Sequence, residues 1–256
     1  MCLAVLSLNQ HLESPLIIVS NRDEFYARPS EPMCFWIDAP NVLGGRDLKC
    51  GGTWFGINGQ GHFGLITNFR EIGRTDPQAT SRGQIVKCFL TQNSKPLEFI
   101  ETVLTNAGSY NGFSLILGTP DEVHYYSNRR RGRKSLLSGV YGLSNGDLDV
   151  PWPKVEKAKL KLRSLQTSMI PTSVALLDLL HDESRPPDNQ LPDTGVGIEL
   201  ERMLSPMFIR GDGYGTRVTT ALVASKAGNI SVSEPTYHAG EGGHSDRHFS
   251  FDIEVD

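Results

Sequence analysis

The second residue of the chain is a cysteine, and it opens the apolar run Cys2–Leu6, which predicts a first β-strand. Removal of the initiator methionine would leave a thiol and a free α-amino group on one residue. An α-amine has an ordinary pKa of about 7.7–8.0, so it can accept a proton from the thiol, whose thiolate is nucleophilic. The alternative is that Cys2 is a small buried hydrophobic residue. If Cys2 is catalytic, the fold must place the start of its first strand at a reaction site.

Bulk properties limit the class of protein. The 256 residues fit one large domain or two small ones, and the formal net charge of −4 argues against a nucleic-acid partner. We expect no membrane span, because no apolar run approaches 18 residues. None of the four cysteines is spaced as CxxC, so neither a zinc site nor a disulfide framework is indicated, and a reducing cytoplasm is expected.

Strands and helices are predicted in blocks rather than in strict alternation. This order favours an α+β layered fold over repeated βαβ units. Helices are expected over Gly83–Gln92, with Ser81 as a cap, and over Pro96–Asn106. Two more are expected after Pro151-Trp152-Pro153 and after Thr172, which can cap the last of them. The predicted strands cover residues 2–9, 16–21, 53–58, 62–68, 113–117, 123–127, 217–224, 229–233 and 247–255.

A dense polar run, Asn21-Arg22-Asp23-Glu24, follows the second predicted strand. If that strand pairs antiparallel with the first, the run ends beside Cys2. Asp23 could then accept a hydrogen bond from the terminal ammonium, and Arg22 could lower the pKa of the thiol. The alternative is a solvated, charged turn.

Two asparagines and one arginine stand at the ends of other predicted strands. Asn68 and Asn145 each close an apolar strand, where a side-chain amide can donate to an oxyanion or simply form a turn. Arg217 follows a Gly-rich segment and is expected to open a strand that could face the site. That segment lacks the Lys-Ser/Thr of a phosphate loop, so nucleotide binding is not expected.

A cluster of histidines near the C-terminus suggests a metal site. Its members are His238, His244 and His248, with Glu241 and Asp246. The Gly-rich residues 239–243 instead indicate a hairpin tip, and zinc sites need rigid ligands. We therefore expect no metal.

The order of the motifs closely resembles the NRDE family, also called the Transport and Golgi organization protein 2 family. The family takes its name from the run at 21–24, and the matching blocks extend along nearly the whole chain. The blocks are Asn21–Pro29, Gly44–Asp47, Gly51–Trp54, Thr67–Arg70, Tyr110–Phe113, Gly142–Asn145, Pro151–Lys154 and Tyr214–Arg217.

This resemblance implies a fold like that of N-terminal nucleophile hydrolases, a four-layer αββα sandwich formed by a single domain over residues 1–256. Among enzymes, the family is most similar to the bile-salt hydrolases and penicillin V acylases, which use a processed N-terminal cysteine. An arginine of those enzymes would fall on Ser20, so that element is missing unless Arg22 replaces it. The site residues that the resemblance implies are Cys2, Asn21, Asp23, Asn68, Asn145 and Arg217, and the residue-level reasoning adds Arg22.

Two functions remain open at this point. One is an amidohydrolase that cleaves an amide or acyl bond in a small metabolite. The other is a non-catalytic carrier, because the family is implicated in haem trafficking, in lipid and acyl-CoA homeostasis and in organisation of the secretory pathway. The chain has no CxxCH motif and no evident pair of axial ligands, so no cofactor is expected to be required and haem would be cargo.

Overall fold

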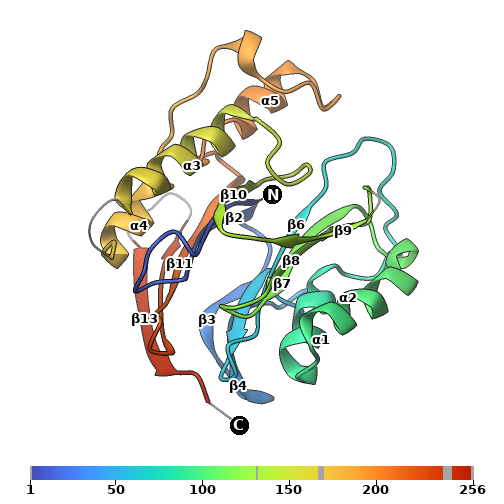
Figure 1. Ribbon diagram of the computed structural model, residues 1–256. Coiled ribbons are helices and arrows are strands. Elements are labelled where there is room, and N and C mark those ends of the chain that lie inside the picture. The colour runs from blue at the N-terminus through green and yellow to red at the C-terminus, as the bar shows by residue number, and fades with distance from the viewer. Residues whose placement is uncertain (1, 131, 167–169, 239–243, 255–256) are drawn as a thin grey trace.

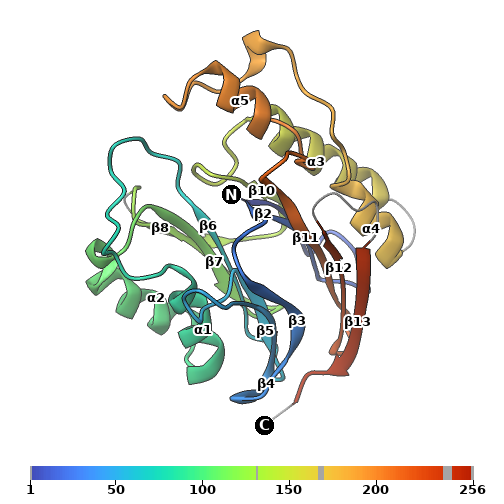
Figure 2. The same cartoon turned by 180° about the vertical axis from the view of Figure 1, so that it is seen from behind.

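Two β-sheets pack face to face, and helices cover their outer faces (Figure 1). The computed structural model describes residues 2–130, 132–166, 170–238 and 244–254. The view from behind shows the same four layers, with the helix pairs on opposite outer sides (Figure 2). The predicted α+β, αββα sandwich is therefore confirmed. Within the described ranges, no helix is long and apolar enough to cross a bilayer.

The first sheet has six strands in the order β10-β1-β2-β11-β12-β13, and its neighbours pair antiparallel. Both β1 and β2 lie inside the sheet. The strand bounds are β1 Cys2–Leu8, β2 Leu16–Phe25, β10 Gly139–Leu143, β11 Tyr214–Ala224, β12 Asn229–Tyr237 and β13 His244–Asp252.

The second sheet has seven strands in sequence order from β3 to β9, again antiparallel. A short segment, residues 26–29, carries the chain from β2 in the first sheet to β3 in the second. The bounds are β3 Ser30–Trp36, β4 Ala39–Asp47, β5 Phe55–Asn58, β6 Phe63–Asn68, β7 Phe113–Gly118, β8 Val123–Ser127 and β9 Arg133–Leu136.

The helices form the two outer layers. The helices α1 (Gly83–Gln92) and α2 (Pro96–Thr105) pack on the second sheet, and α3 (Pro153–Leu165) and α4 (Ser173–Leu179) pack on the first. A further helix, α5 (Ile198–Leu204), lies beyond α3 (Figure 1). Two short 3-10 turns complete the described helical structure, η1 Ala107–Ser109 and η2 Asp188–Gln190.

The apolar run at the N-terminus is buried on both faces. Ala4 and Leu6 point into the core between the sheets, whereas Leu3 and Val5 point into the core under α3 and α4. A strand covered on both sides has no polar face, so its sequence reads as continuous rather than alternating hydrophobicity. The prediction of a first strand is confirmed.

The second strand is longer than predicted. It was expected to end at Asn21, with the polar run in or near a turn, but β2 continues to Phe25. The pairing with β11 explains the difference, since its register extends to Phe25 opposite Tyr214. Strand β11 likewise begins at Tyr214, so Arg217 lies within the strand and does not open it.

Several elements were missed or shifted. The strands β3, β4 and β9 and the helix α5 were not predicted. For two of them the sequence pattern of a strand is weak, because β9 is largely exposed and β3 contains a proline. The cap at Ser81 is wrong: α1 has no side-chain cap hydrogen bond. At α4 the predicted cap is confirmed, with Thr172 Oγ1 accepting from the Ala175 backbone N–H at 3.2 Å. The predicted hairpin tip at 239–243 lies outside the described residues, as does Val255 of the last predicted strand.

Candidate active site

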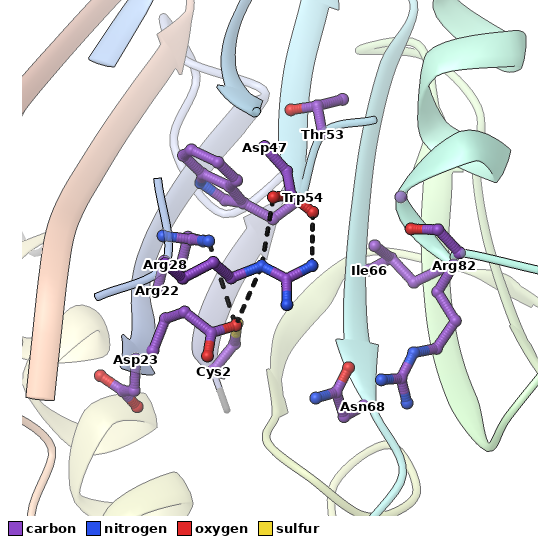
Figure 3. Close-up of a pocket in the computed structure, with 13 residues that line it drawn as sticks. Cys2, Arg22, Asp23, Arg28, Asp47, Thr53, Trp54, Ile66, Asn68 and Arg82 are labelled. Carbon is purple, nitrogen blue, oxygen red and sulfur yellow. Dashed lines mark hydrogen bonds and ion pairs between the residues drawn. The ribbon is translucent and has the colours of Figure 1, made fainter. Parts of the chain in front are cut away.

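Cys2 lines a cavity of about 120 Å³ at the end of the sandwich where the chain crosses from one sheet to the other (Figure 3). The lining is dominated by charged and polar side chains from strands of both sheets and from the start of α1. The lining residues are Cys2, Arg22, Asp23, Glu24, Arg28, Asp47, Thr53, Trp54, Ile66, Asn68, Ser81, Arg82 and Gly83.

The position of Cys2 follows from strand register. Its Cα is paired with that of Arg22 across the antiparallel β1–β2 ladder, which confirms that the polar run at 21–24 lies beside Cys2. Only 8% of Cys2 is exposed, and this burial raises the pKa of the thiol. Arg22 and a hydrogen bond from the backbone of Asp23 act in the opposite direction and favour the thiolate.

Arg22 is held between the sheets. Its guanidinium lies over the ring of Trp54, with Cζ 4.2 Å from the ring centroid, and its side chain is 5% exposed. Glu24 Oε2 is 4.0 Å from Nη2. Burial lowers the pKa of Arg22, while Glu24 and Cys2 raise it. A buried cation stacked on an indole keeps its orientation, so its charge stays directed at the cavity.

Asp23 lies on the face of β2 that points toward the helices. Thr216 Oγ1, on the neighbouring β11, donates to Asp23 Oδ1 at 2.7 Å. Burial raises the pKa of this carboxyl group, and the ammonium of Lys154 lowers it. The structure thus places Asp23 beside Cys2 with a partner that fixes its side chain.

Lys154, at the start of α3, is a site residue that the sequence analysis did not assign. It is 5% exposed, and its Nζ donates to the backbone oxygen of Leu204 at 2.8 Å. Burial lowers the pKa of Lys154 to about 8, against the attraction of Asp23 and Cys2. The available signal was its position directly after Pro151-Trp152-Pro153, which starts a helix inside a family block.

The two asparagines predicted for an oxyanion site occupy different positions. Asn68 closes β6 and lines the cavity. Asn145 is 1% exposed and does not line it; its Nδ2 instead donates to the backbone oxygen of Asn68 at 2.9 Å. Asn145 therefore holds the strand end that carries Asn68.

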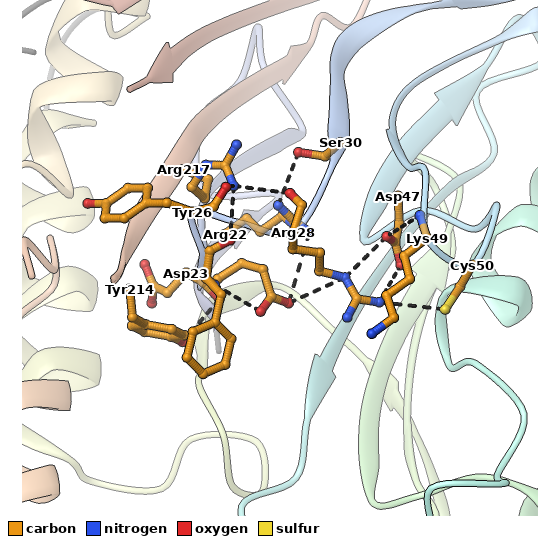
Figure 4. A network of polar contacts seen from close by, with 12 residues as sticks. Arg22, Asp23, Tyr26, Arg28, Ser30, Asp47, Lys49, Cys50, Tyr214 and Arg217 are labelled. Atoms are coloured by element: carbon orange, nitrogen blue, oxygen red, sulfur yellow. Dashed lines mark hydrogen bonds and ion pairs between the residues drawn. The ribbon is translucent and has the colours of Figure 1, made fainter. Parts of the chain in front are cut away.

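Asn21 and Arg217 point away from the cavity. Asn21 is fully buried, and its Nδ2 donates to Met207 O at 2.8 Å while its Oδ1 accepts from Thr219 Oγ1 at 2.7 Å. The Nη1 of Arg217 donates to the backbone oxygens of Phe25, Tyr26 and Arg28 (Figure 4). Arg217 thus fixes the segment that joins the sheets and does not itself line the cavity.

Two further arginines of the cavity were missed. Arg28 forms a bidentate pair with Asp47, from Nε to Oδ1 at 3.1 Å and from Nη2 to Oδ2 at 2.6 Å. Arg82, the residue before α1, donates from Nη1 to Gly112 O at 2.8 Å. Both stand in segments that look like polar loops, so their approach to Cys2 depends on tertiary packing.

Three of the residues considered for a metal lie near one another in the part of the chain that is described, and His244 Nε2 is 3.3 Å from Asp246 Oδ1. His244, Asp246 and His248 lie along β13, and Glu241 is outside the described residues. No group of three or more His, Cys, Asp or Glu side chains in the described ranges is arranged to hold a metal ion.

Comparison with known proteins places the motifs in a family. The family model described as Transport and Golgi organisation 2 matches residues 1–239. The chain belongs to this family. The mouse Transport and Golgi organization 2 homolog is 36% identical over 240 residues, covering 86% of this chain and 85% of the mouse protein. The human homolog is 38% identical over 240 residues, with the same coverage.

This family member also shares some overall shape with a solved enzyme. A mutant of the conjugated bile acid hydrolase from Clostridium perfringens superposes with a TM-score of 0.49 at 11% identity. The superposition covers 99% of this chain and 92% of that one. The likeness is too weak to transfer an activity to this family member, whose chemistry must be argued from its own residues.

Proposed function

We propose that the protein is an N-terminal nucleophile hydrolase that cleaves an amide or acyl bond of a small metabolite, with Cys2 as the nucleophile. One observation carries the proposal: Cys2, which becomes the first residue when Met1 is removed, lies in a cavity next to both Arg22 and Asp23. A cysteine that served only packing would not need two buried, opposite charges beside it, since each charge costs free energy to bury.

The proposed reaction has two steps. The α-amine takes the thiol proton, and the thiolate attacks the carbonyl carbon to form a C–S bond while an electron pair moves to the oxygen. Collapse of this intermediate breaks the C–N bond, and the leaving amine takes the proton from the α-ammonium. Water then hydrolyses the thioester, which releases the acid and restores the thiol.

Each neighbouring residue has a defined task in this scheme. Asp23 orients the α-ammonium, and Arg22 stabilises the thiolate through its positive charge. Asn68 is the donor to the oxyanion, because its side chain lines the cavity. Asn145 positions Asn68 through the hydrogen bond to its backbone oxygen. Asn21 and Arg217 hold in place the strands on which the site residues lie.

Intact-mass analysis of the purified protein tests the first requirement. We expect a mass that lacks Met1. We also expect a transient acyl adduct on Cys2 when the protein is mixed with a panel of activated amides and thioesters. Retention of Met1 in all of the protein would contradict the proposed nucleophile, and binding of haem or lipid by that unprocessed chain would favour the carrier function instead.

A variant pair tests the nucleophile itself. Cys2→Ala keeps a small second residue and a free amine but removes the sulfur, so turnover of a substrate found in the panel should fall by at least about a thousandfold. Cys88→Ala is the control, because Cys88 lies on α1 away from the cavity lining. Equal turnover by Cys2→Ala and the wild type would rule out catalysis by this thiol.

We also propose that the protein works in the reducing cytoplasm. All four cysteines are free, and Cys2 needs a thiol that is not oxidised.

A further inference from the structure

We propose that the cavity binds its ligand through an anionic oxygen group, a carboxylate or a phosphate, and that Arg82 is the residue that receives it. The substrate of the proposed hydrolase would then carry this group close to the bond that is cleaved. For the substrate the inference rests on the proposed function, whereas anion binding at Arg82 does not require Cys2 to act as a nucleophile.

The first argument is the pairing of charges around the cavity. The guanidinium of Arg28 is engaged by Asp47 through two hydrogen bonds, and Glu24 Oε2 lies 3.8 Å from Arg28 Nε. The same carboxylate lies 4.0 Å from Arg22 Nη2. On the helix side of β2, Asp23 is balanced by the ammonium of Lys154. The acidic residues of the lining thus already have cationic partners.

Arg82 is the exception among these cations. Its guanidinium donates to the backbone oxygen of Gly112, and it forms no ion pair with a carboxylate of any described residue. Arginine has five N–H donors in a rigid fork, so one carbonyl contact leaves most of them unused. A half-buried guanidinium with so few acceptors is costly unless a ligand supplies them, and a carboxylate or phosphate matches its geometry best.

The position of Arg82 directs it at the site. The side chain extends from the start of α1 toward Asn68 (Figure 3). Ser81 and Gly83 of the same turn also line the cavity, and α1 has no side-chain cap. The positive end of the helix dipole therefore adds to the charge of Arg82 on this wall.

The size of the cavity indicates what part of a ligand it can take. Its volume of about 120 Å³ is below the roughly 300–1,000 Å³ of common small-molecule pockets. It can enclose a short acyl or amino-acid-sized end of a molecule with its charged group, while the rest of a larger molecule stays outside. Arg82 would then bind the charged end of the ligand, while Cys2 lies at the neighbouring bond.

Two alkylating reagents of nearly equal shape test the proposal directly. Iodoacetate and iodoacetamide both react when a thiolate displaces iodide and forms a C–S bond, but only iodoacetate carries a carboxylate. The ratio of their rates at Cys2, measured by peptide mapping, cancels the nucleophilicity of the thiolate. The ratio at Cys88 in the same molecule is the internal reference.

We expect the iodoacetate-to-iodoacetamide ratio at Cys2 to fall by about tenfold in Arg82→Gln, since one charge-assisted pair contributes roughly that factor. Arg82→Lys should keep part of the preference. Lys87→Gln is the matched control, because it also removes one positive charge near the cavity, from a residue of α1 that does not line it. It should leave the ratio unchanged.

Protection of the wild-type protein gives a second measurement that does not depend on the folding of a variant. At constant ionic strength, acetate or phosphate should slow the reaction of Cys2 with iodoacetamide, whereas acetamide should not. The anion that protects at the lower concentration identifies the favoured group.

Equal ratios in wild type and Arg82→Gln, or equal protection by acetate and acetamide, would overturn the anion site. The two proposals fail separately. Loss of the hydrolase function, with Met1 retained, would leave the charge preference of alkylation at Cys2 intact. Conversely, a working hydrolase with no charge preference would show that Arg82 does not select the substrate.

Discussion

The protonation state of Lys154 depends on the buried position of its ammonium group. Its ammonium is almost fully buried at the start of α3, next to Asp23 and against the backbone oxygen of Leu204. Burial favours the neutral amine, and the nearby carboxylate opposes this only in part. Protonation of Lys154 therefore affects both the charge next to Asp23 and the stability of the fold.

Lys154→Met should change how stability depends on pH. The pKa of Lys154 is lowered from 10.5 to about 8 in the folded chain, so between these values the unfolded chain binds more protons. The free energy of unfolding of wild type should therefore rise relative to that of Lys154→Met as the pH increases from about 8 to about 10.5, by roughly 3 kcal/mol at most. Urea unfolding of wild type and variant across this range measures the difference.

Lys157→Met serves as the control, because Lys157 is a half-exposed lysine of the same helix. Its stability should follow that of wild type with pH. A constant difference between wild type and Lys154→Met at every pH would mean that Lys154 is not a buried, titrating amine.

At the scale of elements, β4 contributes to the site through a glycine. A Cβ atom at Gly45 would lie 2.5 Å from Cη2 of Trp54, which is closer than real Cβ contacts allow. Trp54 in turn carries the guanidinium of Arg22. The absence of a side chain on β4 thus sets the position of a charge on β2, in the opposite sheet.

Gly45→Ala should displace Trp54 and, with it, Arg22. We expect a loss of about 1–3 kcal/mol in stability from overpacking. The reaction of Cys2 with iodoacetamide should also slow, because Arg22 favours the thiolate. Gly108→Ala is the control, since a Cβ there meets nothing within 4 Å. If Gly45→Ala is destabilised but Cys2 reacts at an unchanged rate, the position of Trp54 does not affect the reactivity of the thiol.

The sequence predicted local parts of the site better than distant ones. An antiparallel hairpin of the first two strands was enough to place the polar run at 21–24 beside Cys2, whereas the register that pairs Cys2 with Arg22 comes from the structure. The register shift between Thr216 and Val218 could not be predicted, and Arg217 was therefore misplaced. Arg82 lines the cavity from the residue before α1, and Lys154 acts on Asp23 from the start of α3. No local pattern encodes either approach.

On the scale of the whole molecule, a buried carboxylate joins the two sheets. Glu234 on β12 is fully buried and accepts hydrogen bonds from the backbone N–H of Met33 on β3, at 2.8 Å, and from Thr220 Oγ1, at 2.7 Å. The core between the sheets is otherwise mainly apolar. This contact therefore gives a directional link to an interface that hydrophobic packing alone would leave less specific.

Glu234→Gln should make stability less dependent on pH in the acidic range. Burial raises the pKa of Glu234 above 4.5, so in this window the folded chain binds more protons than the unfolded chain. The contribution of Glu234 to stability is therefore greatest below the unfolded pKa and falls as pH rises toward the folded pKa. Wild type should lose stability relative to Glu234→Gln as the pH is raised through this window, as followed by thermal unfolding. A constant offset would contradict a shifted pKa.

The short crossing between the sheets has a consequence for motion. Arg217 Nη1 donates to two carbonyl oxygens within residues 26–29, those of Tyr26 and Arg28, and to that of Phe25 just before them. The Tyr26 backbone N–H donates to Gly213 O at 3.0 Å. The crossing therefore cannot fray alone, because its release requires β2, β11 and the guanidinium to separate together. In native-state hydrogen exchange, the amides of this segment should open with the central strands, and the wall of the cavity would then keep its shape while ligands come and go.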